Sequence, residues 1–185
     1  MRCFAAIPLN EAIRRALREV QQGLDLPGVK VRWVPDDQMH LTLKFLGETT
    51  DDQVVPISRA LDELAAGTPA FTLRARGMGC FPPHGTPRVI WVGIEDPDAA
   101  LNELHQRVET ALAELGFPPE RRRFRPHLTL GRVKRDPQKA VFPAVDGVAE
   151  FDGGDFAADR LILYASQLHR SGAEHTPLHH AAFSG

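Results

Sequence analysis

The tetrapeptide His-Leu-Thr-Leu occurs twice in this chain, once in each half. The first copy starts at His40 and the second at His127. If each copy lies in a strand, its histidine and threonine share one face and its leucines share the other. The leucines can then pack against helices while the two histidine–threonine pairs stay available. One copy alone would usually be ordinary packing, but two copies in register favour a shared site.

Two such pairs across a cleft would suit phosphoryl chemistry. Imidazole titrates near neutral pH, so His40 and His127 can serve as a general acid and a general base. Thr42 and Thr129 would add hydroxyl donors about 6–7 Å further along each strand. Proton transfer at both ends of a phosphoryl group and hydroxyls for its oxygens need no metal and no cofactor.

The hydrophobic pattern around the motifs predicts strands and helices in a repeated order. Strands are expected at 2–9, 29–35, 39–47, 70–81, 88–95, 124–133, 160–168 and 175–183, and helices at 11–23, 50–67 and 96–116. Asn10, the capping-box pattern Thr50–Gln53 and Asp96-Pro97 mark the helix starts. Strand, helix and motif recur with an offset of 87 residues, from position 40 to position 127. We therefore predict one domain over 1–185, made of two intertwined, pseudo-twofold lobes with repeat halves 1–86 and 87–185.

Composition is that of an ordinary globular protein. The 185 residues are 43% hydrophobic and 25% charged, with a net charge of −2. Any RNA or nucleotide partner would therefore have to be held by a local patch rather than a global basic field. Cys3 and Cys80 are expected as buried thiols, since two cysteines make no disulfide framework in a chain of this length. No apolar run is long enough to span a bilayer or resembles a secretory signal, so we expect a cytoplasmic monomer without membrane contact.

The motifs and their flanks resemble the two-histidine (2H) phosphoesterase superfamily. The segments RWVPDDQMHLTLKFLGE and FRPHLTLGRV are similar to the RNA 2',3'-cyclic phosphodiesterases, also called 2'-5' RNA ligases. RCFAAIPL and LILYASQLHRSGAEHTPL fit the same family, so the resemblance covers nearly the whole chain. It implies a bilobal α+β fold in which two antiparallel sheets form a concave cleft, with helices outside.

The resemblance also implies an activity and roles. RNA ending in a 2',3'-cyclic phosphate would be hydrolysed to a 2'-phosphate without a metal. His40 would donate a proton to the leaving 3'-oxygen, His127 would accept one from water, and Thr42 and Thr129 would bind the non-bridging oxygens. A 5'-hydroxyl replacing water would give a 2'-5' linkage. Two alternatives stay open: a phosphodiesterase for small cyclic nucleotides, and a nucleotide- or RNA-binding module with a vestigial site.

Arg132 follows the second motif, and the resemblance implies that it binds phosphate. It lies five residues after His127, which puts it on the opposite face of a regular strand. Gly131 could reverse this through a bulge. We favour the phosphate role over a solvated arginine, because a guanidinium matches phosphate oxygens.

Other residues carry weaker predictions. In the basic run RRRFR, Arg123, Phe124 and Arg125 are candidates for RNA binding. The equal alternative is a solvated loop with Phe124 in the core. Lys44 shares the predicted face of His40 and Thr42 and is expected to be solvated, whereas Phe45 shares the predicted face of the packing leucines. Trp33 and Trp91 are expected in the core rather than in a base pocket. The C-terminal histidines lack the spacing of a zinc site, and one of them, His175, stands where the family commonly has tyrosine.

Overall fold

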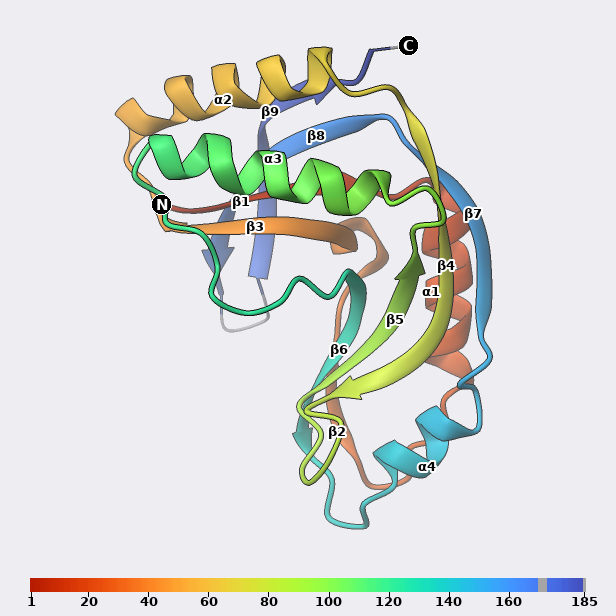
Figure 1. The fold of residues 1–185 in the computed structure, drawn as a ribbon. Helices are drawn as coiled ribbons and strands as arrows, with labels where there is room; N and C mark the ends of the chain where they lie inside the picture. The colour runs from red at the N-terminus through yellow and green to blue at the C-terminus, as the bar shows by residue number, and fades with distance from the viewer. Residues whose placement is uncertain (170–172, 185) are drawn as a thin grey trace.

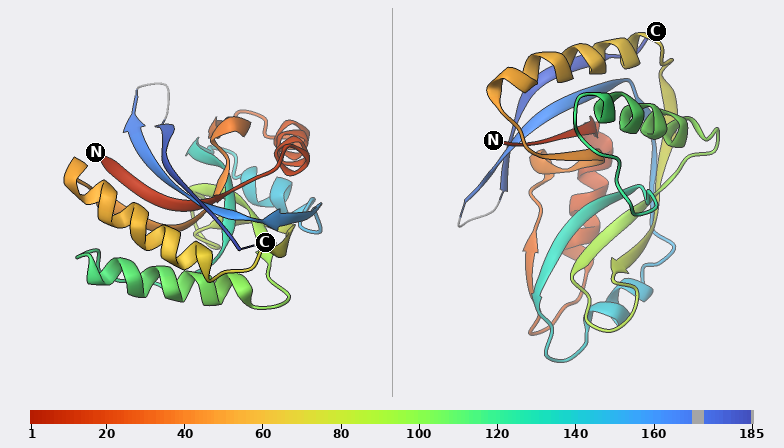
Figure 2. Two further views of the ribbon diagram at one scale, coloured as in Figure 1. Left: turned by 90° about the horizontal axis from the view of Figure 1, so that it is seen from above. Right: turned by 60° about the vertical axis from the view of Figure 1, so that its left-hand side comes forward.

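Two antiparallel sheets meet at an angle, and each carries helices on its outer side (Figures 1 and 2). The computed structural model describes residues 1–169 and 173–184. In chain order the elements are β1 (Arg2–Pro8), α1 (Glu11–Gly23), β2 (Lys30–Trp33), the 3-10 helix η1 (Asp36–Gln38), β3 (His40–Glu48), α2 (Asp51–Ala66), β4 (Phe71–Phe81), β5 (Val89–Glu95), α3 (Ala100–Glu114), β6 (His127–Arg135), α4 (Val141–Asp146), β7 (Asp152–Ala158), β8 (Arg160–Leu168) and β9 (Ala173–Ala182). The predicted α+β class with two antiparallel sheets is confirmed.

Each sheet combines strands from both parts of the chain. The first has the order β3-β1-β8-β9, and the second has the order β2-β6-β5-β4-β7. In both sheets, the strand that carries a His-Leu-Thr-Leu motif pairs with the strand that opens its repeat, β1 or β5. β4 then crosses to pair with β5, and β8 crosses to pair with β1. The two crossovers bind the sheets together and bring β3 and β6 next to each other.

Helices cover the outer faces and bury the motif leucines. α2 and α3 lie side by side over the first sheet, while α1 and α4 pack on the second (Figure 1). Leu41, Leu43, Leu128 and Leu130 are each at most 4% exposed. The predicted split between packing leucines and available histidines is therefore confirmed for both strands.

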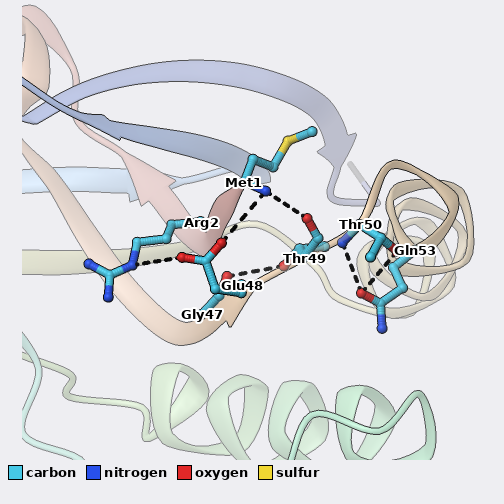
Figure 3. Close-up of polar contacts among 7 residues, drawn as sticks. All are labelled: Met1, Arg2, Gly47, Glu48, Thr49, Thr50 and Gln53. Atoms are coloured by element: carbon cyan, nitrogen blue, oxygen red, sulfur yellow. Dashed lines mark hydrogen bonds and ion pairs between the residues drawn. The ribbon is translucent and has the colours of Figure 1, made fainter.

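Helix starts match the sequence at two of three places. Asn10 caps α1 by accepting from the Ile13 backbone N–H at 2.9 Å. Gln53 accepts from the Thr50 backbone N–H at 3.0 Å at the start of α2, completing the capping box (Figure 3). The third start was wrong: α3 begins at Ala100, because residues 96–99 form a turn before it.

The start of the chain is tied to the far end of β3. The amino group of Met1 donates to the Thr49 carbonyl at 2.9 Å, and Arg2 contacts the Glu48 carboxylate at 3.2 Å (Figure 3). These contacts join the start of β1 to the end of β3, just before α2. The outer end of β3 is thus fixed to β1, and its inner end begins at His40.

Two elements between 136 and 159 were not predicted. They are the short helix α4 and the edge strand β7, which pairs with β4. β7 reads DGGDFAA, a sequence with two glycines and two aspartates. Such residues are depleted in strands, so pairing with β4 rather than local propensity holds β7 in place. The Arg74 guanidinium contributes by contacting both Asp152 and Asp155.

Candidate active site

Both motifs line one cleft of about 850 Å³ between the sheets. His40 and Thr42 enter it from β3, and His127 and Thr129 enter it from β6. All four side chains are half-buried. The residues predicted to form a split site are therefore brought together in space.

A β-bulge lies at the last residue of the first motif, and two predictions are wrong because of it. Lys44 pairs with Ala5 and Thr42 pairs with Ala6, so Leu43 is an extra residue on β3. The bulge reverses the alternation beyond it. Lys44 points into the core and is 1% exposed, and Phe45 lies on the cleft face and is 60% exposed. The expectations of a solvated Lys44 on the cleft face and a packed Phe45 were wrong.

The second motif has the same bulge at the same place. Gly131 pairs with Ile90 and Thr129 pairs with Trp91, so Leu130 is the extra residue on β6. Arg132 is thereby turned onto the cleft face and lines the cleft with His127 and Thr129. The strand therefore has the bulge that Arg132 needs to reach the face of His127.

Gly131 is required by the neighbouring strand. A Cβ on this residue would lie 2.8 Å from a ring carbon of Trp33 and 2.7 Å from a methyl of Val31. Both contacts are too short for a real side chain, so glycine lets β2 pack closely over the bulge. Trp33 itself also lines the cleft, whereas Trp91 packs against Phe81 at a centroid distance of 5.1 Å.

The two histidines have the same hydrogen-bonded orientation. His40 Nδ1 lies 2.8 Å from the Gln38 carbonyl oxygen, and His127 Nδ1 lies 2.7 Å from the Arg125 carbonyl oxygen. A carbonyl only accepts, so Nδ1 carries a hydrogen in both rings. Nε2 of each ring is then the nitrogen that can take up or release a proton. Each histidine is held by the carbonyl two residues before it.

Their surroundings differ. The His40 ring stacks on Phe4 at 4.6 Å and meets the edge of His175 at 5.1 Å. Burial, and then the charge of His175, lowers the pKa of His40 to about 4, against an opposing effect of its bond to the Gln38 carbonyl. His127 has one ring neighbour, Phe81, edge-on at 5.0 Å. In the ligand-free protein His40 is therefore neutral at pH 7.

His175 joins the site from β9. Nothing in the sequence pattern gave a reason to place this residue in the site. Its ring lines the cleft, and burial lowers its pKa. Its backbone N–H donates to the Gln38 side chain at 2.8 Å, and the Gln38 carbonyl holds His40. Gln38 thus connects β9 to the first motif. The alignment of β8 with β9 places His175 here, and neither strand's own sequence specifies that alignment.

The remaining candidates lie elsewhere. Phe124 stacks on His105 of α3 at 3.8 Å, and Arg123 and Arg125 are exposed without lining the cleft. His179 contacts Asp62 of α2 at 2.7 Å, away from His175. Among the described residues, no group of three or more His, Cys, Asp or Glu side chains is placed to hold a metal ion.

Cys3 and Cys80 are both buried free thiols, as expected. No helix in the described parts of the chain is long and apolar enough to cross a membrane.

Comparison with known proteins agrees with this geometry. A family model described as LigT-like phosphoesterase matches residues 7–91 and again residues 92–174. The RNA 2',3'-cyclic phosphodiesterase of Thermotoga maritima is 35% identical over 185 residues, covering 100% of this chain and 97% of the relative. The protein of the same name from Archaeoglobus fulgidus is 35% identical and covers 88% of this chain and 92% of the relative.

Solved structures share the whole fold. The protein TT0787 of Thermus thermophilus superposes with a TM-score of 0.86 at 29% identity, covering 99% of this chain and 98% of that one. E. coli LigT complexed with 3'-AMP superposes with a TM-score of 0.77 at 28% identity, covering 100% and 98%. With the family model matching most of its length in two successive segments, the chain belongs to the LigT-like phosphoesterase family of the 2H superfamily.

Proposed function

We propose that this protein hydrolyses 2',3'-cyclic phosphate ends of RNA to 2'-phosphates. The observation that carries the proposal is the pair of equivalent histidine–threonine faces lining one cleft, each histidine with Nδ1 bonded to a carbonyl. The name shared by its relatives, RNA 2',3'-cyclic phosphodiesterase, supports the same substrate. Both motifs belong to one chain, so a monomer would contain the complete site.

His127 is assigned as the proton acceptor. In the neutral form of the ring the lone pair on Nε2 is free, because Nδ1 donates to the Arg125 carbonyl. It would take a proton from water as the water oxygen attacks phosphorus. The bond from phosphorus to the 3'-oxygen breaks, and a proton from His40 completes the 3'-hydroxyl. Thr42, Thr129 and Arg132 would bind the non-bridging oxygens, whose negative charge matches hydroxyl and guanidinium donors.

The donor role of His40 requires that substrate binding changes its protonation. With a pKa of about 4, the free ring is uncharged at neutral pH. A phosphate anion in the cleft favours the imidazolium and raises that pKa, since an opposite charge stabilises the charged form. Proton uptake should therefore accompany binding of the substrate. Once formed, an imidazolium in this apolar surrounding is a strong proton donor.

The same site supports ligation. A 5'-hydroxyl in the place of water would attack the cyclic phosphate and form a 2'-5' linkage, with the same two proton transfers. Water is present at far higher concentration than RNA ends. Hydrolysis is therefore the expected net direction in dilute solution.

The test is hydrolysis of a 2',3'-cyclic nucleotide in the presence of EDTA. Phosphorus NMR should show a 2'-phosphate product, and His40→Ala and His127→Ala should each lower kcat by about 10²–10⁴-fold, the usual contribution of a general acid or base. A 3'-phosphate product would mean that the 2'-oxygen, and not the 3'-oxygen, is the leaving group. Full activity in either alanine variant would refute the role assigned to that histidine.

A further inference from the structure

A second depression continues from the cleft along the end of β6. This groove, of about 460 Å³, is lined by Thr86, Pro87, Arg88, Val89, Arg132, Val133, Lys134, Arg135 and Asp136. Val89 and Arg132 line both the groove and the cleft. A ligand held at Arg132 in the cleft can therefore extend into the groove without crossing another element.

The groove is strongly cationic. Arg88, Arg132, Lys134 and Arg135 line it, and all four are exposed. Within the described residues, none of these four side chains takes part in an ion pair. The carboxylate among the lining residues, Asp136, is engaged: it accepts from two backbone N–H groups at the start of α4, at 2.8 and 3.3 Å.

Cations also face each other across the neighbouring ladder. Lys30 of β2 lies directly opposite Arg135 of β6, and Arg32 lies directly opposite Arg132. Like charges at directly opposed strand positions destabilise a sheet. A bound anion at this end of the ladder would offset the repulsion between Lys30 and Arg135.

The backbone holds this face in place. Arg88 donates from its N–H to the Phe81 carbonyl at 2.8 Å and accepts at its carbonyl from Val133 at 2.9 Å. Residue 88 is thereby fixed to both β4 and β6. The groove has walls joined by backbone hydrogen bonds and exposed cationic side chains, which is typical of sites that follow a phosphate backbone without reading its sequence.

We propose that this basic groove binds the phosphodiester backbone of the RNA strand next to its cyclic phosphate end. The inference rests on the proposed function and says where the RNA strand beside the cyclic phosphate end is bound. The terminal phosphate lies at the two motifs, Arg132 marks the junction, and Arg88, Lys134 and Arg135 contact the preceding phosphates. The basic run with Arg123 and Arg125 is a separate surface and is not part of this path.

The experiment compares two substrates: a 2',3'-cyclic mononucleotide and a five-nucleotide RNA with the same cyclic end. kcat/KM for each is measured at low and high salt. The variants are Arg88→Ala with Arg135→Ala in one protein, Arg59→Ala on α2 as a matched exposed-charge control, and Arg123→Ala with Arg125→Ala for the rival surface. Urea unfolding of each variant verifies that it is folded.

The wild type should prefer the oligonucleotide. The Arg88→Ala/Arg135→Ala variant should lower kcat/KM for the oligonucleotide by about tenfold at low salt and leave kcat/KM for the mononucleotide within about twofold. Its salt dependence should also be weaker, since each lost phosphate contact reduces the slope of log affinity against log salt concentration by about 0.7. Arg59→Ala should change neither substrate.

An equal loss of kcat/KM on both substrates in the Arg88→Ala/Arg135→Ala variant would overturn the groove assignment. A loss specific to the oligonucleotide that occurs only in the Arg123→Ala/Arg125→Ala variant would overturn it too. Absence of a wild-type preference would do the same. Hydrolysis of the mononucleotide depends on the proposed function but not on the groove. A protein that hydrolyses neither substrate therefore refutes the proposed function, whereas one that hydrolyses both without the expected difference refutes only the groove assignment.

Discussion

The buried ion pair behind the first motif gives the sharpest prediction for stability. Lys44 Nζ lies 2.7 Å from Glu109 Oε2, and donates to the Pro118 carbonyl at 2.9 Å. Glu109 also accepts from the Glu120 backbone N–H at 3.0 Å. One carboxylate thus joins β3, α3 and the segment that leads to His127.

Removing Glu109 should lower the free energy of unfolding more than removing Lys44. The Lys44 side chain is 0% exposed, so Glu109→Ala leaves an ammonium buried without its counter-charge and should cost about 3–5 kcal/mol. The Glu109 side chain is 11% exposed and keeps the Glu120 N–H, so Lys44→Met should cost less, about 1–3 kcal/mol. The first loss is a large part of the roughly 5–15 kcal/mol that stabilises a typical domain.

Urea unfolding at pH 7 measures both changes, and a double variant provides an uncharged reference. Lys44→Met with Glu109→Leu replaces the pair by apolar side chains, and should be more stable than Glu109→Ala alone because no charge stays buried. A cost below about 1 kcal/mol for Glu109→Ala, or a larger cost for Lys44→Met, would refute this account of the pair.

Three further predictions concern the site and the thiols. Because unfolded histidine binds a proton near pH 6.5 and folded His40 only near 4, its contribution to the free energy of unfolding is complete above pH 6.5 and is lost as pH falls towards 4. Wild type should therefore lose about 3 kcal/mol more than His40→Asn between pH 7 and pH 4 in urea titrations, and equal losses would contradict the lowered pKa. Gly131→Ala should destabilise by about 1–3 kcal/mol through its clash with Trp33 and lower kcat/KM, whereas Gly23→Ala, with open space around it, should change neither; a fully active, stable Gly131→Ala would exclude the clash. Burial raises the pKa of the Cys80 thiol to about 11, so iodoacetamide at pH 8 should modify it only after unfolding, as mass spectrometry can show.

Most of the site could be predicted from local sequence, because strand alternation is a local rule. It assigned the motif leucines to the core and His40, Thr42, His127 and Thr129 to the opposite face, and the structure has this arrangement. The rule failed at Lys44 and Phe45. A bulge depends on how β3 pairs with β1, and the partner that keeps Lys44 buried lies 65 residues away. Alignment of the two motifs, HLTLKF with HLTLGR, would have carried the Gly131 argument over to Lys44.

Other parts could not be predicted because distant pairing decides them. β7 has little strand propensity and exists as a partner of β4. His175 reaches the cleft because β9 aligns with β8, and β8 crosses to β1. The basic groove joins residues from the loop before β5 and from the end of β6, which only the folded sheet brings together.

The paired bulges give the cleft a direction. They turn one residue after each motif towards the cleft: Phe45 on one side and Arg132 on the other. A cleft with identical halves would accept a cyclic phosphate in two opposite orientations, and either histidine could then serve either end. An aromatic ring facing a guanidinium removes that equivalence, since the ring favours an apolar or planar group and the guanidinium favours an anion. The two motif strands share the same tetrapeptide, and the difference at this pair of positions helps to make the two sides of the cleft unequal.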